Sequence, residues 1–285
     1  MSRNIAELQS IQGRFRVARS AVQAVGAALM FLRGKDTSGW QSFGGQLKTS
    51  VDKAAEGWVL GYLGALYPQD RFLCEELFEQ TGEAWNAPAV FWTIDALDGT
   101  RSFVEGFDGF CVQVAYVEDG QVKLGVVHEP VRRVTYWALE GQGAFRQTED
   151  GECKRLQVQL LTGWPPKPVF VDSTRPDGPV GRLMANRSGQ FLECGSIGLK
   201  VCRVADGTAH MFAKALTFKL WDTAPGDLIL QEAGGRLGRW SGEPVRYDGK
   251  QVYFENLLAA STTLFELAVL ELCGSSAEGK GRFNK

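Results

Sequence analysis

Hydrophobic positions recur at helical spacing in the first part of the chain. From residue 4 to residue 33, apolar side chains stand three or four positions apart, which places them on one face of a helix. This segment is predicted to form one long helix or a broken one. The Gly- and Ser-rich stretch 34–48 predicts a loop or hairpin. A second amphipathic helix is expected from residue 52 to about residue 66.

Strand patterns dominate from residue 91 to residue 136. The apolar runs 110–117 and 122–128 flank a polar turn that contains Gly120, which predicts a β-hairpin. A shorter apolar run at 72–74 ends at two glutamates and is predicted to be a short strand. The middle of the chain is therefore expected to build a sheet.

Helices and strands alternate through the second half of the chain without a single repeating unit. The pattern predicts strands at 169–171, 209–213 and 252–260, and helices at 178–185, 197–207, 227–233 and 262–273. The tail 274–285 is polar. We expect layered α and β elements in two lobes, an N-terminal α+β lobe over residues 1–154 and a C-terminal α/β lobe over residues 155–285.

The composition is that of an ordinary globular protein, with 285 residues, 44% of them apolar and 22% charged. The net charge of −2 argues against a nucleic-acid polymer or an anionic membrane surface as the main partner. No apolar run approaches the roughly 20 residues that span a bilayer, and no signal-peptide core is visible. The six cysteines form no C-x-x-C pair and there are two histidines, so a zinc site is not expected. Free thiols in a cytoplasmic protein are the simplest interpretation.

The most informative segment is W-T-I-D-A-L-D-G-T at residues 92–100. Asp95 and Asp98 stand three apart in an apolar run that breaks at Gly99. A carboxylate inside a buried strand costs several kcal/mol unless it is paired or binds a metal. Two of them at a strand end indicate a site for a hard cation such as Mg²⁺. The alternative is a capped strand end, in which Asp98 accepts hydrogen bonds from backbone N–H groups of a turn.

Other acidic positions each allow a functional and an ordinary interpretation. Glu75 and Glu76 follow a short apolar run, where they are either metal ligands or solvated side chains. Asp222 precedes a predicted helix and is expected to be its N-cap, a position that also favours anions. Asp52 follows Thr49 and is equally a candidate N-cap.

The order of these segments resembles the inositol monophosphatase superfamily of Mg²⁺-dependent, lithium-sensitive phosphomonoesterases. T-x-x-D at residues 49–52 is followed by E-E, then W-T-I-D-x-L-D-G-T, then W-D-T-A-x-G with E-A-G-G behind it. The resemblance covers residues 49–237. It implies an α+β fold, a layered αβαβα sandwich of the inositol monophosphatase and fructose-1,6-bisphosphatase type. It also implies a site between two lobes that holds two or three Mg²⁺ ions.

The resemblance assigns roles to individual residues. The metal ligands would be Glu75, Asp95, the carbonyl of Leu97, Asp98 and Asp222. Gly99 and Thr100 would present N–H groups and a hydroxyl to the phosphate and the attacking water. Asp52 would act through Thr100 to take up the proton of the water, and Glu76 would lie behind the ligands. Glu75 and Asp98 would thereby take part in catalysis together with Asp52 and Thr100.

The substrate is less clearly indicated. G-S-I-G-L-K at residues 195–200 keeps the lysine of the bacterial 3′(2′),5′-bisphosphate nucleotidases, which hydrolyse 3′-phosphoadenosine 5′-phosphate (PAP), but lacks the paired serines before leucine. Substrate contacts are expected from Ser196, Lys200, Arg101 and Asp222. Lys200 or Arg101 would meet a second phosphate, although each is equally readable as a solvated surface charge.

T-R-S-F at residues 100–103 also resembles histidinol-phosphate phosphatases, so inositol-1-phosphate and histidinol phosphate are the alternative substrates. A sugar bisphosphatase and a non-enzymatic scaffold of this fold are further alternatives, and the complete carboxylate set argues against the scaffold. The expected partner is a small phosphate ester. Family members often form homodimers, although the sequence shows no interface pattern.

Overall fold

The computed structural model describes residues 2–33, 41–43, 46–82 and 84–278. It contains a seven-stranded sheet in the order β3-β4-β5-β6-β7-β8-β9, called here the N-terminal sheet. β3 and β4 are parallel and every other neighbouring pair is antiparallel. The strands are β3 (Arg71–Cys74), β4 (Val90–Asp98), β5 (Cys111–Glu118), β6 (Gln121–Glu129), β7 (Val134–Leu139), β8 (Gly143–Gln147) and β9 (Cys153–Arg155).

A second sheet of five strands, the C-terminal sheet, has the order β11-β10-β12-β14-β13 and mixes parallel and antiparallel pairs. Its strands are β10 (Val169–Asp172), β11 (Gln190–Glu193), β12 (Met211–Lys219), β13 (Gly235–Arg239) and β14 (Tyr253–Ser261). A separate pair, β1 (Gln41–Phe43) and β2 (Gln46–Lys48), is antiparallel, which confirms the predicted hairpin in its described part.

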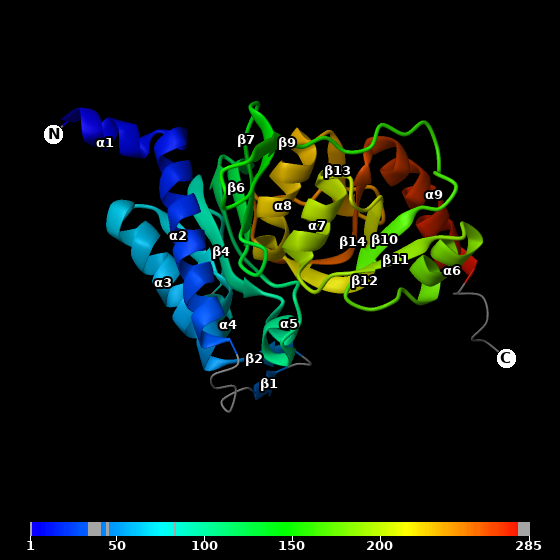
Figure 1. Cartoon of the computed structure of the whole chain (residues 1–285), viewed down its shortest axis with the longest axis horizontal. Helices are drawn as coiled ribbons and strands as arrows, with labels where there is room; N and C mark the ends of the chain where they lie inside the picture. The colour runs from blue at the N-terminus through cyan, green and yellow to red at the C-terminus, as the bar shows by residue number, and fades with distance from the viewer. Residues whose placement is uncertain (1, 34–40, 44–45, 83, 279–285) are drawn as a thin grey trace.

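Helices separate and cover the two sheets, so the molecule has five layers (Figure 1). The helices are α1 (Ser2–Gln9), α2 (Ile11–Leu32), α3 (Ser50–Leu66), α4 (Glu75–Thr81), α5 (Thr100–Glu105), α6 (Gly178–Asn186), α7 (Ile197–Ala205), α8 (Leu220–Glu232) and α9 (Thr262–Glu278). α2 and α3 cover the outer face of the N-terminal sheet, α7 and α8 fill the space between the sheets, and α6 and α9 cover the C-terminal sheet. This arrangement confirms the predicted αβαβα sandwich.

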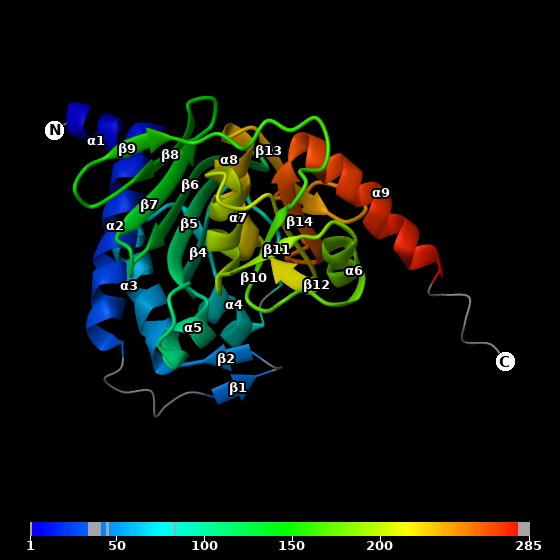
Figure 2. The same cartoon turned by 45° about the vertical axis from the view of Figure 1, so that its right-hand side comes forward.

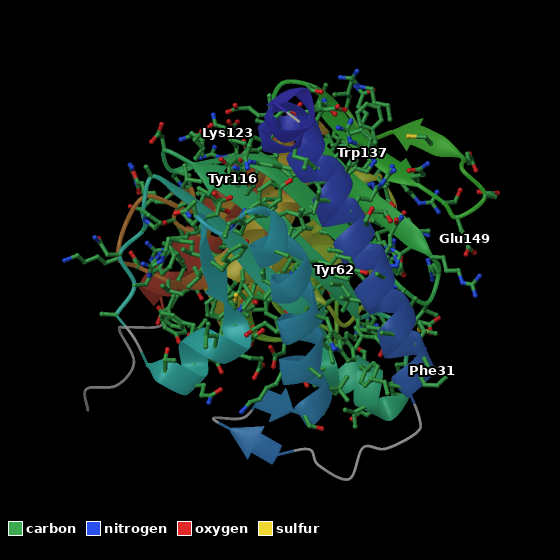
Figure 3. The ribbon with its side chains drawn as sticks, turned by 90° about the vertical axis from the view of Figure 1, so that its left-hand side faces the viewer. Phe31, Tyr62, Tyr116, Lys123, Trp137 and Glu149 are labelled. Carbon is green, nitrogen blue, oxygen red and sulfur yellow. The ribbon has the colours of Figure 1, made fainter. Side chains whose placement is uncertain are left out.

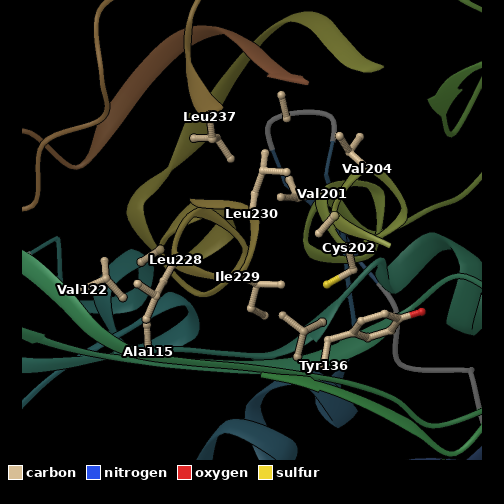
Figure 4. Packing of buried hydrophobic residues seen from close by; sticks show 14 of the residues in the cluster. Ala115, Val122, Tyr136, Val201, Cys202, Val204, Leu228, Ile229, Leu230 and Leu237 are labelled. Atoms are coloured by element: carbon tan, nitrogen blue, oxygen red, sulfur yellow. The ribbon is translucent and has the colours of Figure 1, made fainter. Parts of the chain in front are cut away.

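The central layer holds the largest hydrophobic core. Figure 4 shows Ala115 and Tyr136 of the N-terminal sheet facing Leu228 and Ile229 of α8, with Val201 of α7 beside them. These strands are buried on both faces because helices lie on both sides, and their sequences are accordingly continuous apolar runs. The apolar runs that predicted strands are thus explained by the sandwich.

The outer helix α2 begins after Ser10, whose hydroxyl accepts a hydrogen bond from the N–H of Gly13. The first predicted helix is therefore broken at this residue. At 22 residues, α2 is long and apolar enough to span a membrane by length and composition, which the sequence analysis did not anticipate. One face of it, including Phe15, Val22 and Leu29, is buried in the core that this helix shares with the N-terminal sheet. Figure 3 shows α2 crossing the outer face of that sheet beside α3.

Two helix starts differ from the predictions because capping decides them. α3 begins at Ser50 with Thr49 as its N-cap, and Asp52 is the third helical residue, whose carboxylate accepts the backbone N–H of Thr49. α8 begins at Leu220, seven residues before the predicted start, and Asp222 again occupies the third position rather than the N-cap. Both aspartates therefore hold the backbone of the residue that precedes their helix.

Candidate active site

The C-terminal end of β4 delivers Asp95 and Asp98 to the site. β4 loses its regular pairing with β5 between these residues, so the strand bends where the two carboxylates leave it. Asp95 is 3% exposed and accepts a hydrogen bond from the N–H of Leu97 at 3.1 Å. The helices α4 and α5 follow the C-terminal ends of the parallel strands β3 and β4, and both lie below β4 at this end of the sheet in Figures 1 and 2.

Three carboxylates from different elements converge beside the strand end. Glu75 begins α4, Asp95 lies on β4 and Asp222 lies in the first turn of α8. One ligand atom from each lies within 4.8 Å of the other two, among the residues that the structure describes. Carboxylate oxygens in this number are the ligands that Mg²⁺ and Ca²⁺ prefer, so the donor set fits a hard divalent cation.

The electrostatics of this cluster also favour a bound cation. Burial raises the pKa of Asp95 well above its usual value, and the charges of Glu75, Asp98 and Asp222 raise it further. Burial likewise raises the pKa of Asp222 to about 8, although Lys219 opposes the shift. Buried carboxylates that repel one another are costly to ionise without a bound cation. The chemistry of the donor set therefore fits a metal site.

Asp98 lies beside this cluster and is held by the N-terminal sheet and by the start of α7. Its Oδ2 atom accepts hydrogen bonds from the hydroxyl of Ser196 at 2.6 Å and from the N–H of Gly198 at 2.8 Å. The side-chain amide of Gln113 donates to the same atom at 3.2 Å. Ser196 is fully buried at the N-cap of α7, so its side chain reaches Asp98 rather than the pocket. The predicted role of Asp98 as a ligand stays a prediction. Ser196 holds that carboxylate and is not part of the pocket lining, and its predicted contact with the substrate also stays a prediction.

Thr100 and Asp52 form the predicted pair. The Thr100 hydroxyl donates to Oδ1 of Asp52 at 2.7 Å. The other carboxylate oxygen of Asp52 accepts the hydroxyl of Thr49 at 2.5 Å and its N–H at 2.8 Å. Burial raises the pKa of Asp52, and these hydrogen bonds oppose the rise. The Thr100 hydroxyl therefore has Asp52 as its nearer acceptor, with the carbonyl oxygen of Leu97 farther away at 3.3 Å.

Gly99 makes the sharp turn between β4 and α5. Its φ of +95° is left-handed, and a Cβ atom would lie 2.8 Å from the carbonyl oxygen of Gly109. Gly99 and Thr100 both line the pocket at the start of α5. The turn at Gly99 thus explains why both residues lie at the pocket, as predicted.

These residues open into a polar pocket of about 420 Å³. One part of its lining carries the acidic cluster with Leu97, Asp98, Thr100 and Arg101. Another part comes from the C-terminal sheet and α7, and it consists of Ser173, Gly195, Ile197, Lys200, Lys214, Leu216, Thr217 and Lys219. Arg101 is exposed, so its interpretation as a solvated charge remains open, whereas its place in the lining keeps it a candidate for substrate contact.

Lys200 is not a solvated charge. It is 3% exposed, and its ammonium lies 3.1 Å from Oδ1 of Asp172. Lys214 lies 2.9 Å from the same oxygen. Asp172 is itself buried, so a single carboxylate is shared by two ammonium groups that line the pocket. This arrangement leaves one net positive charge at this end of the lining.

Sequence reasoning missed several residues that support the site, namely Glu56, Gln113, Asp172, Lys214 and Lys219. The signal for Glu56 was available, because it stands four residues after Asp52 and therefore on the same face of α3. The other four are joined to the site by contacts between distant segments, which spacing in the sequence does not reveal.

Glu56 holds the start of α4, the helix that presents Glu75. Its two carboxylate oxygens accept the backbone N–H groups of Glu76 at 2.7 Å and of Leu77 at 2.9 Å. Burial raises the pKa of Glu56 to about 7, and the two N–H donors oppose the shift. α3 therefore positions two parts of the site, Thr100 through Asp52 and Glu75 through Glu56.

We expect Glu56→Ala to lower the free energy of unfolding by about 1–3 kcal/mol, because two buried N–H groups lose their acceptor. Glu56→Gln keeps one acceptor oxygen and is expected to lose less. Urea denaturation measures both, with Lys53→Ala on the exposed face of α3 as the control, for which a change within about 0.5 kcal/mol is expected. A loss for Glu56→Ala no larger than that of the control would contradict the capping role.

The five-layer αβαβα fold and the carboxylate cluster in a polar pocket are the fold and the site expected of a phosphatase of the superfamily that the sequence resembles. The family model described as the inositol monophosphatase family matches residues 11–272. The chain therefore belongs to the inositol monophosphatase family, whose members are phosphatases and thus hydrolases.

Individual relatives carry different names. The chain is 32% identical over 216 residues to the fructose-1,6-bisphosphatase/inositol-1-monophosphatase of Thermotoga maritima, which covers 73% of this chain and 77% of that protein. It is 33% identical over 209 residues to the 3′(2′),5′-bisphosphate nucleotidase CysQ of Salmonella typhimurium, and this match covers 72% of this chain and 81% of that protein. Among solved structures, the Thermotoga maritima IMPase has a TM-score of 0.78 at 26% identity and covers 93% of this chain and 98% of that chain. These relatives are similar to the same degree, so identity alone does not choose the substrate.

Proposed function

We propose that this chain is a Mg²⁺-dependent phosphomonoesterase that hydrolyses PAP to AMP and phosphate. The observation that carries the proposal is the combination, in one pocket, of the carboxylate cluster with the Lys200–Asp172–Lys214 arrangement. A bisphosphate needs one place where its scissile phosphate meets the cation and another place for its second phosphate. The two ammonium groups meet the second need by charge-assisted hydrogen bonds.

Glu75, Asp95 and Asp222 would hold the cation, with Asp98 and the carbonyl oxygen of Leu97 as further ligands. When bound, Mg²⁺ supplies Lewis-acid activation of water and neutralises charge on the phosphate. Because the hydroxyl proton of Thr100 is directed at Asp52, a lone pair of that oxygen is free to accept a hydrogen bond from the attacking water. Asp52 is placed to receive the proton through Thr100. The N–H groups at Gly99 and Thr100 would orient the phosphate.

Inositol-1-phosphate or histidinol phosphate is the alternative substrate, and the names of the relatives support this class of monophosphate as well as PAP. Neither alternative carries a second phosphate for the lysine pair. Lithium inhibition, homodimer formation and a cytoplasmic location follow from family resemblance and remain predictions. The substrate is best decided by comparing kcat/KM for PAP, 3′-AMP, inositol-1-phosphate, histidinol phosphate and fructose-1,6-bisphosphate, and a clear preference for a monophosphate would contradict the proposal.

The lysine pair gives a sharper test. We expect Lys200→Ala to raise KM for PAP about 10- to 100-fold, since a hydrogen bond to a charged group contributes about 1.5–3 kcal/mol. KM for 3′-AMP, which lacks the 5′-phosphate, should stay within about threefold of the unmodified value because the interaction is absent there. Steady-state kinetics on both esters measure the difference.

Lys123→Ala is the matched control, because Lys123 pairs with Glu140 at 2.7 Å outside the pocket and its loss should alter neither KM. Equal rises in KM for both esters in Lys200→Ala would show that Lys200 does not recognise a second phosphate. The proposed phosphatase activity would still stand.

A further inference from the structure

Lys219 lies inside the acidic cluster. It is the last residue of β12, directly before α8, and its side chain is 8% exposed. Its ammonium nitrogen lies 3.5 Å from Oε1 of Glu75 and 3.4 Å from Oε1 of Glu79. Its backbone N–H donates to Oδ2 of Asp222 at 2.8 Å. One residue therefore contacts two of the three clustered carboxylates, Glu75 by its charge and Asp222 by its backbone.

The charge of Lys219 affects the cluster in two opposite ways. The ammonium of Lys219 is positive at neutral pH, so it relieves the repulsion among the carboxylates when no metal is bound. The same charge repels a divalent cation that binds to Glu75, Asp95 and Asp222, and the buried setting screens that repulsion only weakly. Both effects follow from the position of one nitrogen atom.

We propose that Lys219 is a resident cation of the metal site and shares Glu75 with the bound metal. Its charge stabilises the metal-free protein and weakens the affinity of the site for divalent cations. The proposal rests on the metal-binding part of the proposed function and goes beyond it, because it assigns to a residue outside the ligand set the control of metal affinity. Lys214 lines the same pocket but pairs with Asp172 rather than with the cluster, and it has no such role.

Two measurements with opposite expected signs separate this role from ordinary structural support. In Lys219→Gln, the dissociation constant for Mg²⁺, measured by titration calorimetry without any phosphate ester, should fall at least about fivefold. The melting temperature of the same variant in EDTA should also fall, because the carboxylates lose their resident counter-ion. Lys219→Arg keeps the charge and should bind Mg²⁺ within about twofold of the unmodified chain. If Lys219 merely supported the fold, its replacement by Gln would lower both the stability of the protein and its affinity for Mg²⁺.

Lys214→Gln is the matched control, since it removes the same charge from the same pocket and should leave the Mg²⁺ affinity within about twofold. Lys219→Met retains the apolar stem in the buried site and serves if the glutamine variant does not fold. An unchanged or weaker Mg²⁺ affinity in folded Lys219→Gln or Lys219→Met, the variants that remove the charge, would overturn the proposal. Because no ester is present, an error about the substrate leaves these titrations fully readable, whereas an unmodified chain that binds no Mg²⁺ would overturn the proposed function itself.

Discussion

Asp95→Asn is expected to lower kcat by about a thousandfold or more, which corresponds to roughly 4 kcal/mol of activation free energy. Asp95 is the central carboxylate of the cluster, and the amide removes the charge that a divalent cation needs while preserving the shape. The variant should still fold. Phosphate release at saturating Mg²⁺ measures the loss.

The same substitution should not weaken the metal-free protein. The pKa of Asp95 is raised in the folded state, so at neutral pH its ionisation is harder in the folded chain than in the unfolded chain. A neutral amide escapes this cost, and urea denaturation in EDTA at neutral pH should therefore show equal or greater stability. Mg²⁺ should stabilise the unmodified chain and fail to stabilise the variant.

Asp150→Asn provides the control, because Asp150 is exposed and lies outside the pocket lining. It should retain full turnover and full stabilisation by Mg²⁺. Activity of Asp95→Asn within tenfold of the unmodified chain, about 1.4 kcal/mol, would show that Asp95 does not bind a catalytic metal.

Arg203→Ala is expected to have the largest effect on stability, about 3–5 kcal/mol. The guanidinium of Arg203 donates to both carboxylate oxygens of Glu129, at 2.6 Å and 2.7 Å, and also to the hydroxyl of Tyr136. Both charged groups are buried, so the substitution removes the close partner of the buried Glu129 carboxylate and leaves it with the largely exposed Arg132 at 3.5 Å. The pair also joins α7, whose first turn holds Asp98, to the N-terminal sheet. Urea denaturation gives the change in unfolding free energy.

Arg133→Ala offers a matched comparison. Arg133 pairs with Glu149 at 2.7 Å, but both side chains are more than half exposed, so the loss should be below about 1 kcal/mol. Combining Arg203→Ala with Glu129→Gln should recover part of the loss, because the buried charge that has lost its close partner is then removed as well. Similar losses for the two arginine variants would contradict the argument from burial.

Periodicity predicted the elements of the N-terminal sheet and its hairpin well, because buried strands and amphipathic helices leave local patterns. It failed at α8, where the helix was predicted to start at residue 227 but starts at Leu220, with Pro225 inside it. The helix runs through Pro225 because tertiary packing outweighs local preference. Gly125 on β6 has no side chain, so the backbone at Pro225 can approach it closely. A Cβ atom on residue 125 would lie 2.4 Å from the carbonyl oxygen of Pro225. Such contacts between distant segments are not visible in local pattern.

The carboxylates of the candidate site were predictable because each stands at the end of an apolar run or at a helix start. What the sequence alone did not provide was the set of partners. Lys200 was open to interpretation as a solvated charge, and its burial against Asp172 is a property of the assembled pocket. Lys219 likewise acquires meaning only beside Glu75, 144 positions earlier in the chain. Residue types and order therefore indicated the chemistry, while substrate contacts and metal affinity depend on long-range geometry.

The most direct test of the central claim is the release of inorganic phosphate from PAP by the purified chain. We predict release in the presence of Mg²⁺, loss of release when EDTA removes the metal, and recovery when Mg²⁺ is added again. Release that persists undiminished in EDTA, or no release from PAP or from any of the monophosphates with Mg²⁺ present, would contradict the account.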